Sequence, residues 1–298
     1  MQHKNLNCQK LYQNFWDGIL ESKIDSISNL REFVFDLEWS FDHIRQMLAR
    51  RVESYIERKA ESIYHEGVKK KREEWLVSQI FDTRKFDLGQ GNRPPHLVLG
   101  TLAGNIPRRI LSLCKLSAKV AKKKKSEIIQ FDHVESVLRK FGENTIKDIS
   151  SEYRSLCPNI SKLIYRFSGV TKYFKNYSSL IKFIEKQICN KIDIEITGVA
   201  KKANAKEIAN FLYYIGFIDA RKHITAGRKY HIKAHELPDL SDSQYNDKYD
   251  DFFWEIKPGY RNVLNIGRKK NKDLINKKKR KGKAKKTTSN KNIHPSRW

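Results

Sequence analysis

Helix punctuation in the stretch 105–167 constrains the fold more than any other part of the chain. Pro107 stands where a first helical turn would begin, a position that suits proline because its missing N–H has no helical partner there. Phe131 and Asp132 mark the start of a further helix. Apolar residues recur at helical spacing after both helix starts, which predicts two buried helix faces. The predicted faces are Leu111, Cys114, Leu116 and Ala118, and Val134, Val137 and Leu138.

The pattern changes after residue 170, where two helices precede alternating segments. Helices are predicted at 177–189 and at 206–215, and the second ends at Gly216, which suits a helix C-terminus. A turn at 225–228 joins two short stretches with strand character, so a β-hairpin is expected. Two helices followed by a hairpin of this size resemble a winged-helix domain.

The predicted fold class is mostly α, with a helical bundle followed by a winged helix and a basic tail. Alternation of apolar residues in 252–266 predicts one more strand and a short closing helix. The predicted organisation is an N-terminal helical region at 1–95, a lid-like helical domain at 96–169, a winged-helix domain at 170–266 and a tail at 267–298.

The net charge favours polyanionic partners. The 298 residues contain 60 Lys and Arg against 34 Asp and Glu, which gives +26. Residues 267–298 contain 14 basic residues and one acidic residue, so the tail carries +13 and the rest of the chain another +13. The tail has almost no apolar anchors and is predicted to be disordered. An excess of this size promotes binding to nucleic acid through counterion release. The alternative is a solubilising surface, for which a smaller excess would be enough.

Several classes of protein are disfavoured by the composition. The four cysteines are widely separated and form no C-x-x-C pair, so neither a zinc site nor a disulfide framework is expected. The N-terminus lacks a signal-peptide core, and no apolar run reaches about 18 residues, so we expect a cytoplasmic protein without a membrane partner. No His, Asp, Glu or Ser set has catalytic or metal-binding spacing, so we expect no catalytic residues, no metal and no enzyme activity.

The helical stretch resembles the lid that follows the nucleotide-binding core in AAA+-like P-loop ATPases. The nearest group is the bacterial P-loop ATPases related to origin-recognition and STAND-type proteins, and the resemblance covers about 30–266. It implies an ATPase-associated role in bacterial mobile elements or antiviral (phage) defence. Origin-type ATPases carry a winged helix after the lid, which suits the predicted hairpin domain. The matching pieces are Pro107 with Arg108, 129–137, 148–153 with Pro158 and Ile160, and 37–55 as the segment that leads into the lid.

No phosphate-binding loop of the form G-x-x-x-x-G-K-[ST] occurs in the chain. That loop holds the nucleotide phosphates, so no cofactor is expected unless a separate or upstream P-loop core supplies an ATP site. The resemblance places Arg108 where lids of this class carry an arginine that senses the γ-phosphate, and Arg109 is an equal choice by position. The alternative is a surface arginine near a helix start.

Basic residues gather around the predicted winged helix. Such a domain lays a recognition helix in the major groove while its wing contacts phosphates. The run 122–125 is either a solvated connector or a further phosphate contact. The predicted nucleic-acid contacts are Lys201, Lys202, Lys206, Arg221, Lys222, Arg228, Lys229, Lys233, Lys277, Lys278, Lys279 and Arg280.

The predicted function is that of a non-catalytic nucleic-acid-binding module in a P-loop ATPase assembly, with double-stranded DNA as the partner. One alternative is a protein-interaction subunit that docks on a separate NTPase or effector, because winged helices also mediate protein contacts. A second alternative is a truncated ATPase whose core lies upstream.

Overall fold

A computed structural model gives the fold, and the chain divides into the units Met1–Ile266 and Gly267–Trp298. Only Gly267 of the second unit is described, so the predicted disordered tail lies outside the described residues. None of the described helices is long and apolar enough to cross a membrane. The described residues are 39–58, 69–83, 86, 91–198, 202–223, 229–232 and 252–267.

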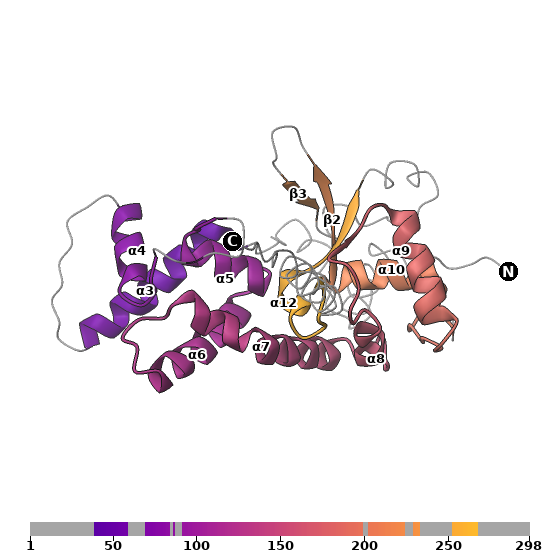
Figure 1. The fold of residues 1–298 in the computed structure, drawn as a ribbon, viewed down its shortest axis with the longest axis horizontal. Coiled ribbons are helices and arrows are strands. Elements are labelled where there is room, and N and C mark those ends of the chain that lie inside the picture. Colours follow the sequence, from indigo (N-terminus) through magenta and orange to yellow (C-terminus); the bar gives the residue numbers. More distant parts are fainter. Residues whose placement is uncertain are drawn as a thin grey trace, which may run out of the picture. The chain divides into compact units, whose positions relative to one another are not determined.

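The N-terminal part of the described chain is helical (Figure 1). Proline opens both α5 and α6, and the predicted helix starts at Pro107 and Phe131 are confirmed. Gly104 and Asn105, with φ of 66° and 59°, form the turn between α5 and α6, a backbone conformation that glycine and asparagine tolerate best. The helices are α3 (Phe41–Arg58), α4 (Lys69–Ser78), α5 (Pro95–Ala103), α6 (Pro107–Lys123) and α7 (Phe131–Glu152).

A first hydrophobic core lies among these five helices. Arg45 of α3 is buried at its edge, with Nε 2.9 Å from the Glu73 carboxylate of α4 and a second contact to Asp42. Because a buried charge needs a partner, this pairing links α3 to α4. The apolar residues at its centre include Ile44, Val98, Leu99, Ile110, Leu113 and Val134.

The C-terminal part of the described chain contains further helices. The predicted helix from residue 177 is confirmed, but its last turn has π-helical hydrogen bonding. The predicted helix that ends at Gly216 is also confirmed, with φ of 65° at that glycine. These elements are α8 (Ile160–Tyr165), α9 (Tyr177–Ile184), the π-helical turn η2 (Glu185–Cys189), α10 (Ala205–Tyr214) and α12 (Pro258–Arg261).

A four-stranded antiparallel sheet accompanies these helices, in the strand order β1-β4-β2-β3. The predicted hairpin is confirmed as β2 (Ile218–His223) paired with β3 (Lys229–Ile232). The predicted last strand is confirmed as β4 (Phe253–Ile256), while β1 (Tyr173–Phe174) was not predicted. The fold is therefore mostly α with a small antiparallel sheet, as the sequence predicted at that level.

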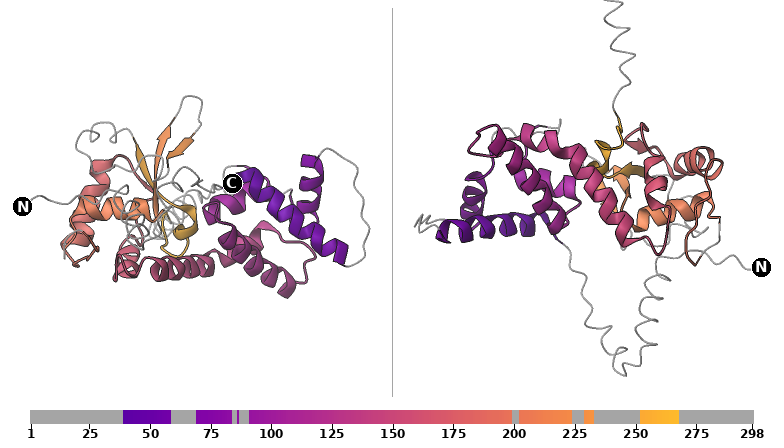
Figure 2. Two further views of the ribbon diagram at one scale, coloured as in Figure 1. Left: turned by 180° about the vertical axis from the view of Figure 1, so that it is seen from behind. Right: turned by 90° about the horizontal axis from the view of Figure 1, so that it is seen from below.

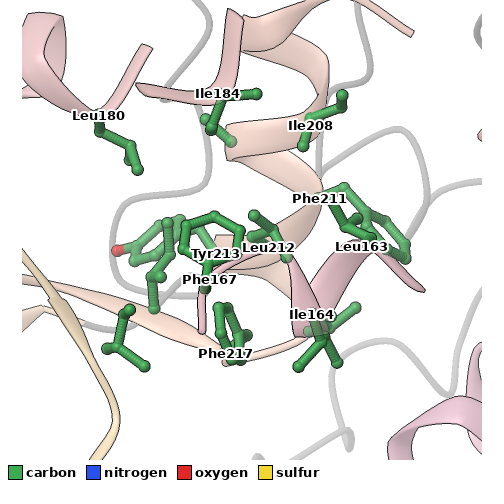
Figure 3. Close-up of a cluster of buried hydrophobic side chains, with 14 of the residues drawn as sticks. Leu163, Ile164, Phe167, Leu180, Ile184, Ile208, Phe211, Leu212, Tyr213 and Phe217 are labelled. Carbon is green, nitrogen blue, oxygen red and sulfur yellow. The ribbon is translucent and has the colours of Figure 1, made fainter. Parts of the chain in front are cut away.

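One face of the sheet packs on α9 and α10 and forms a second hydrophobic core (Figure 3). Trp254 of β4 is fully buried, and its ring contacts those of Tyr177 and Tyr213 at 5.4 and 5.6 Å between centroids. Ile146 and Ile149 of α7 belong to this core, although the first half of α7 belongs to the other one. Residues of α8 and the turn after it, Leu163, Ile164 and Phe167, also lie here.

The short helix α12 packs against α7 and α5 (Figures 1 and 2). Two glycines permit this close approach. A Cβ on Gly259 would lie 2.4 Å from the Leu102 carbonyl oxygen of α5, and a Cβ on Gly142 would lie 2.7 Å from Cγ1 of Val263. Helix backbones therefore meet where the two cores adjoin, and only glycine fits at these positions.

Candidate nucleic-acid interface

Five exposed cations lie in a row along α6. Their side chains fall on the face opposite the buried residues Ile110, Leu113, Ser117 and Ala121, because the two sets are out of phase at 3.6 residues per turn. The helix contains no acidic residue. We call this set the α6 basic row, and it consists of Arg108, Lys115, Lys119, Lys122 and Lys123.

The middle of the α6 basic row has no acidic partner among the described residues. No described carboxylate lies within 4.0 Å of Lys115, Lys119, Lys122 or Lys123. Lys122 and Lys123 lie in the last turn, where the helix dipole favours a cation. That explanation does not extend to Lys115 and Lys119, which lie in the middle of the helix. Their charges are therefore available to an anionic partner.

Among the ion pairs of the described residues, acidic side chains approach the α6 basic row only near its two ends. At one end, the Arg108 guanidinium lies 3.9 Å from the Asp148 carboxylate of α7, and both side chains are exposed. At the other end, Lys124 Nζ lies 2.6 Å from Asp132, and this contact lowers the pKa of the Asp132 carboxyl. Lys124 is therefore the paired member of the lysine run, and exposed pairs of this kind contribute little to stability.

The two arginines considered for nucleotide sensing face different surroundings. Arg108 is 76% exposed in its side chain, whereas Arg109 is half-buried and approaches Tyr260 of α12. Burial raises the pKa of Tyr260 to about 12, and the Arg109 guanidinium opposes that shift. Arg109 is thus placed beside α12, while Arg108 projects from the helix start.

A pocket of about 450 Å³ lies between α4 and the start of α5. Neither Arg108 nor Arg109 lines it. Burial lowers the pKa of its His96, which is therefore neutral at pH 7. Among the described residues no group of three or more His, Cys, Asp or Glu side chains could hold a metal ion. This pocket therefore gives the nucleotide-sensing hypothesis no support.

The candidate recognition helix α10 is almost entirely buried. Six consecutive residues from Ile208 to Tyr213 are buried, and Asn210, which could read a base, is only 3% exposed. The side chain of Asn204 accepts a hydrogen bond from the Glu207 N–H at 3.0 Å and so caps the helix. Lys206 is exposed at its first turn. In this arrangement α10 offers no continuous face to a DNA groove.

The other predicted contacts that the structure describes lie on the segment before α10 and on the β2–β3 hairpin. Lys202 Nζ lies 2.8 Å from Asp193, in an exposed pair. Lys222 is exposed, and its Nζ lies 5.5 Å from the centre of the Phe252 ring. Lys229 belongs to β3. The predicted contacts Lys201, Arg228, Lys233, Lys277, Lys278, Lys279 and Arg280 lie outside the described residues.

Arg221 is held inside the fold. Its side chain is 7% exposed, and Nη1 lies 2.7 Å from the Glu255 carboxylate on the neighbouring strand β4. Its guanidinium lies 5.1 Å from the ring centre of Tyr173 and 5.3 Å from that of Phe253. Arg261 of α12 pairs with the same Glu255. This placement suits a structural ion pair between β2, β4 and α12 rather than a phosphate contact.

Two further titratable groups share this outer face of the sheet. Burial raises the pKa of the Asp219 carboxyl, although Lys257 Nζ lies 3.2 Å away and opposes that shift. Burial lowers the pKa of His231 on β3, and the carboxylates of Asp219 and Glu255 oppose it. Folding therefore favours the neutral form of both Asp219 and His231.

The buried Asp219 predicts a pH dependence of stability. Its pKa is raised, so the folded protein holds this proton more tightly than the unfolded chain does. This contribution is complete below the ordinary value of 3.8 and is lost as the pH rises through the folded-state pKa. We expect Asp219→Asn, which cannot ionise, to gain stability relative to the wild type as the pH rises from about 4 through the folded-state pKa of Asp219. Urea unfolding of both proteins at successive pH values measures the difference. A difference that shrinks with rising pH would instead mean that the ion pair with Lys257 dominates.

The α6 basic row was readable from the sequence but not recognised as a unit. Lys115, Lys119 and Lys122 recur at intervals of four and three residues, which is the helical repeat. No pattern in the sequence indicated the partners of Arg221. Glu255 follows Arg221 by more than thirty residues, and the register of the strands decides whether the two meet.

Comparisons of the chain with protein-family models, with curated proteins and with solved structures found no match.

Proposed function

We propose that this chain is a non-catalytic nucleic-acid-binding module whose partner is double-stranded DNA. The observation that carries the proposal is the α6 basic row, in which five exposed cations share a helix face without an acidic residue. Neutralising phosphates and releasing their counterions is the main source of affinity for DNA. A net charge of +26 adds long-range attraction to the same partner.

The order of elements supports the wider assignment. α9, α10, the β2–β3 hairpin and β4 follow one another, with β4 between β1 and β2, an order compatible with a winged helix whose hairpin is extended. The helices α5 to α7 are compatible with a lid of the AAA+ type. A role within a P-loop ATPase assembly, in phage defence or on a mobile element, rests on the resemblance of the sequence. Nucleotide sensing by Arg108 or Arg109 and a cytoplasmic location remain expectations.

Salt-dependent DNA binding tests the proposal. We expect electrophoretic shifts of a DNA duplex at about 50 mM salt, and an affinity loss of roughly 10²–10³-fold at about 200 mM if about five phosphates are neutralised. The same duplex at several intermediate salt concentrations gives the slope of log K against log salt. Absence of binding at the lowest salt, or an affinity that does not respond to salt, would remove the basis for this function.

The buried α10 favours one alternative, a protein-interaction subunit that docks on a separate NTPase or effector. A winged helix whose helical face is closed is better suited to protein contacts than to base reading. This alternative predicts that the chain co-purifies with a specific partner at salt concentrations that abolish DNA binding. The proposed function predicts that both the partner and the DNA are lost together, or that no partner is found.

A further inference from the structure

We infer that the α6 basic row binds the phosphate backbone of double-stranded DNA without reading its sequence. This inference rests on the proposed function and specifies its binding surface and mode. It assigns the contact to α6, outside the hairpin and α10 region on which the sequence had placed most of the predicted contacts.

The chemistry of the α6 basic row is suited to phosphates more than to bases. Arg and Lys can also contact guanine, but adenine and cytosine are read by Asn, Gln or acidic side chains, and α6 has none of these. The row offers four lysines and one arginine, with Ser112 as the other polar side chain on that face. Lysine acts on phosphate as a point charge that carries no directional pattern. Because α10 is closed as well, neither helix presents base-reading amides.

The α6 basic row also selects among nucleic acids. Single strands bind proteins largely by stacking their bases on aromatic side chains, and this face of α6 carries none. The major groove of B-DNA, about 12 Å wide, accepts an α-helix between its phosphate rims. The major groove of an RNA duplex is deep and too narrow for side chains to read. A helix with lysines along its exposed face therefore fits a DNA duplex better than either alternative.

The length of the row is sufficient for several phosphates. Arg108 and Lys123 are fifteen residues apart, which corresponds to about 22 Å along the helix. Phosphates of one strand follow one another at about 3.4 Å along the duplex axis, so five flexible cations can reach separate phosphates over this distance. Each contact is expected to add about 0.9 to the slope of log K against log salt.

The test compares two variants of the full chain that each lose two positive charges. Lys115→Gln with Lys119→Gln removes the unpaired centre of the row. Arg139→Gln with Lys140→Gln is the matched control, because these exposed cations of α7 already pair with Glu143. The tail is the same in both proteins, so its own contribution to binding is equal.

We expect the row variant to lower the salt slope by about two and the affinity roughly 10–100-fold at about 0.1 M salt, for every duplex sequence alike. The control variant should bind within about threefold of the wild type, since an exposed and already paired charge contributes little. Lys115→Arg with Lys119→Arg should retain binding because the charge is kept. Glutamine keeps helix propensity, so unchanged thermal unfolding of all variants shows that the fold is intact.

The outcomes separate this inference from the function on which it rests. If the wild type does not bind DNA, the proposed function fails. If the wild type binds and the row variant keeps its affinity and slope, the function stands and the α6 assignment is overturned. Tighter binding to single-stranded DNA or to an RNA duplex overturns the choice of DNA duplex. A preference above about tenfold for one duplex sequence overturns backbone-only binding.

Discussion

Glu255→Ala is expected to lower the free energy of unfolding by about 3–5 kcal/mol, because it leaves a buried cation without its partner. Arg221 is 7% exposed and Glu255 is 12% exposed, so water cannot replace the lost carboxylate. Arg261 of α12 loses its ion pair with the same carboxylate and keeps only the hydrogen bond from its Nε to the Ile256 carbonyl oxygen of β4, at 2.8 Å. Urea-induced unfolding gives the change in stability directly.

A double variant serves as the control for this expectation. Arg221→Met with Glu255→Leu removes both charges and keeps similar apolar volume, so it should recover most of the lost stability. Arg221→Met alone should reduce stability while leaving the salt slope of DNA binding unchanged in the folded protein. A normal stability combined with a slope reduced by about one would show that Arg221 does contact a phosphate.

The second large effect is expected at Gly259. Gly259→Ala places a Cβ 2.4 Å from the Leu102 carbonyl oxygen, and a backbone atom cannot turn aside as a side chain does. We expect a loss of about 3 kcal/mol, because α12 must move away from α5 and expose part of both cores. Thermal unfolding followed by circular dichroism would report it as a lower midpoint.

Gly142→Ala provides the comparison, because its clash is with a side chain. The new Cβ meets Val263 Cγ1 at 2.7 Å, and Val263→Ala in the same protein should relieve the clash in part, because Val263 Cβ at 3.0 Å and the Gly259 carbonyl oxygen at 3.1 Å remain. The same second substitution should not relieve Gly259→Ala. Equal relief of both would mean that the glycines respond to a common repacking of α12 and not to two separate contacts.

Helix positions and strand alternation were predictable from the sequence because both are local. Pro107 and Gly216 mark helix ends through their own backbone preferences, and the hairpin follows from residues on either side of one turn. The surroundings of Arg221 were not predictable in this way. Its exposure depends on which residues β4 and β1 bring beside it, and those strands are distant in sequence.

The burial of α10 was not predicted from the sequence, for a different reason. Lys206 was predicted to contact nucleic acid, which presupposes an exposed face on this helix. The helix AKEIANFLYY is nevertheless apolar on most of its circumference, and that composition is typical of a helix enclosed in a core. In a candidate recognition helix, the width of the apolar face therefore predicts burial better than a few polar residues predict exposure.

α7 sets the distance between the two hydrophobic cores. This helix of 22 residues, about 33 Å long, belongs to one core with its first half and to the other with its second half. α12, near the C-terminal end of the described chain, packs against α7 and α5 at the same junction between the cores. A partner fixed on the α6 side and a second partner fixed at the sheet would therefore be kept at a set spacing, and neither core could rotate without breaking a continuous helix.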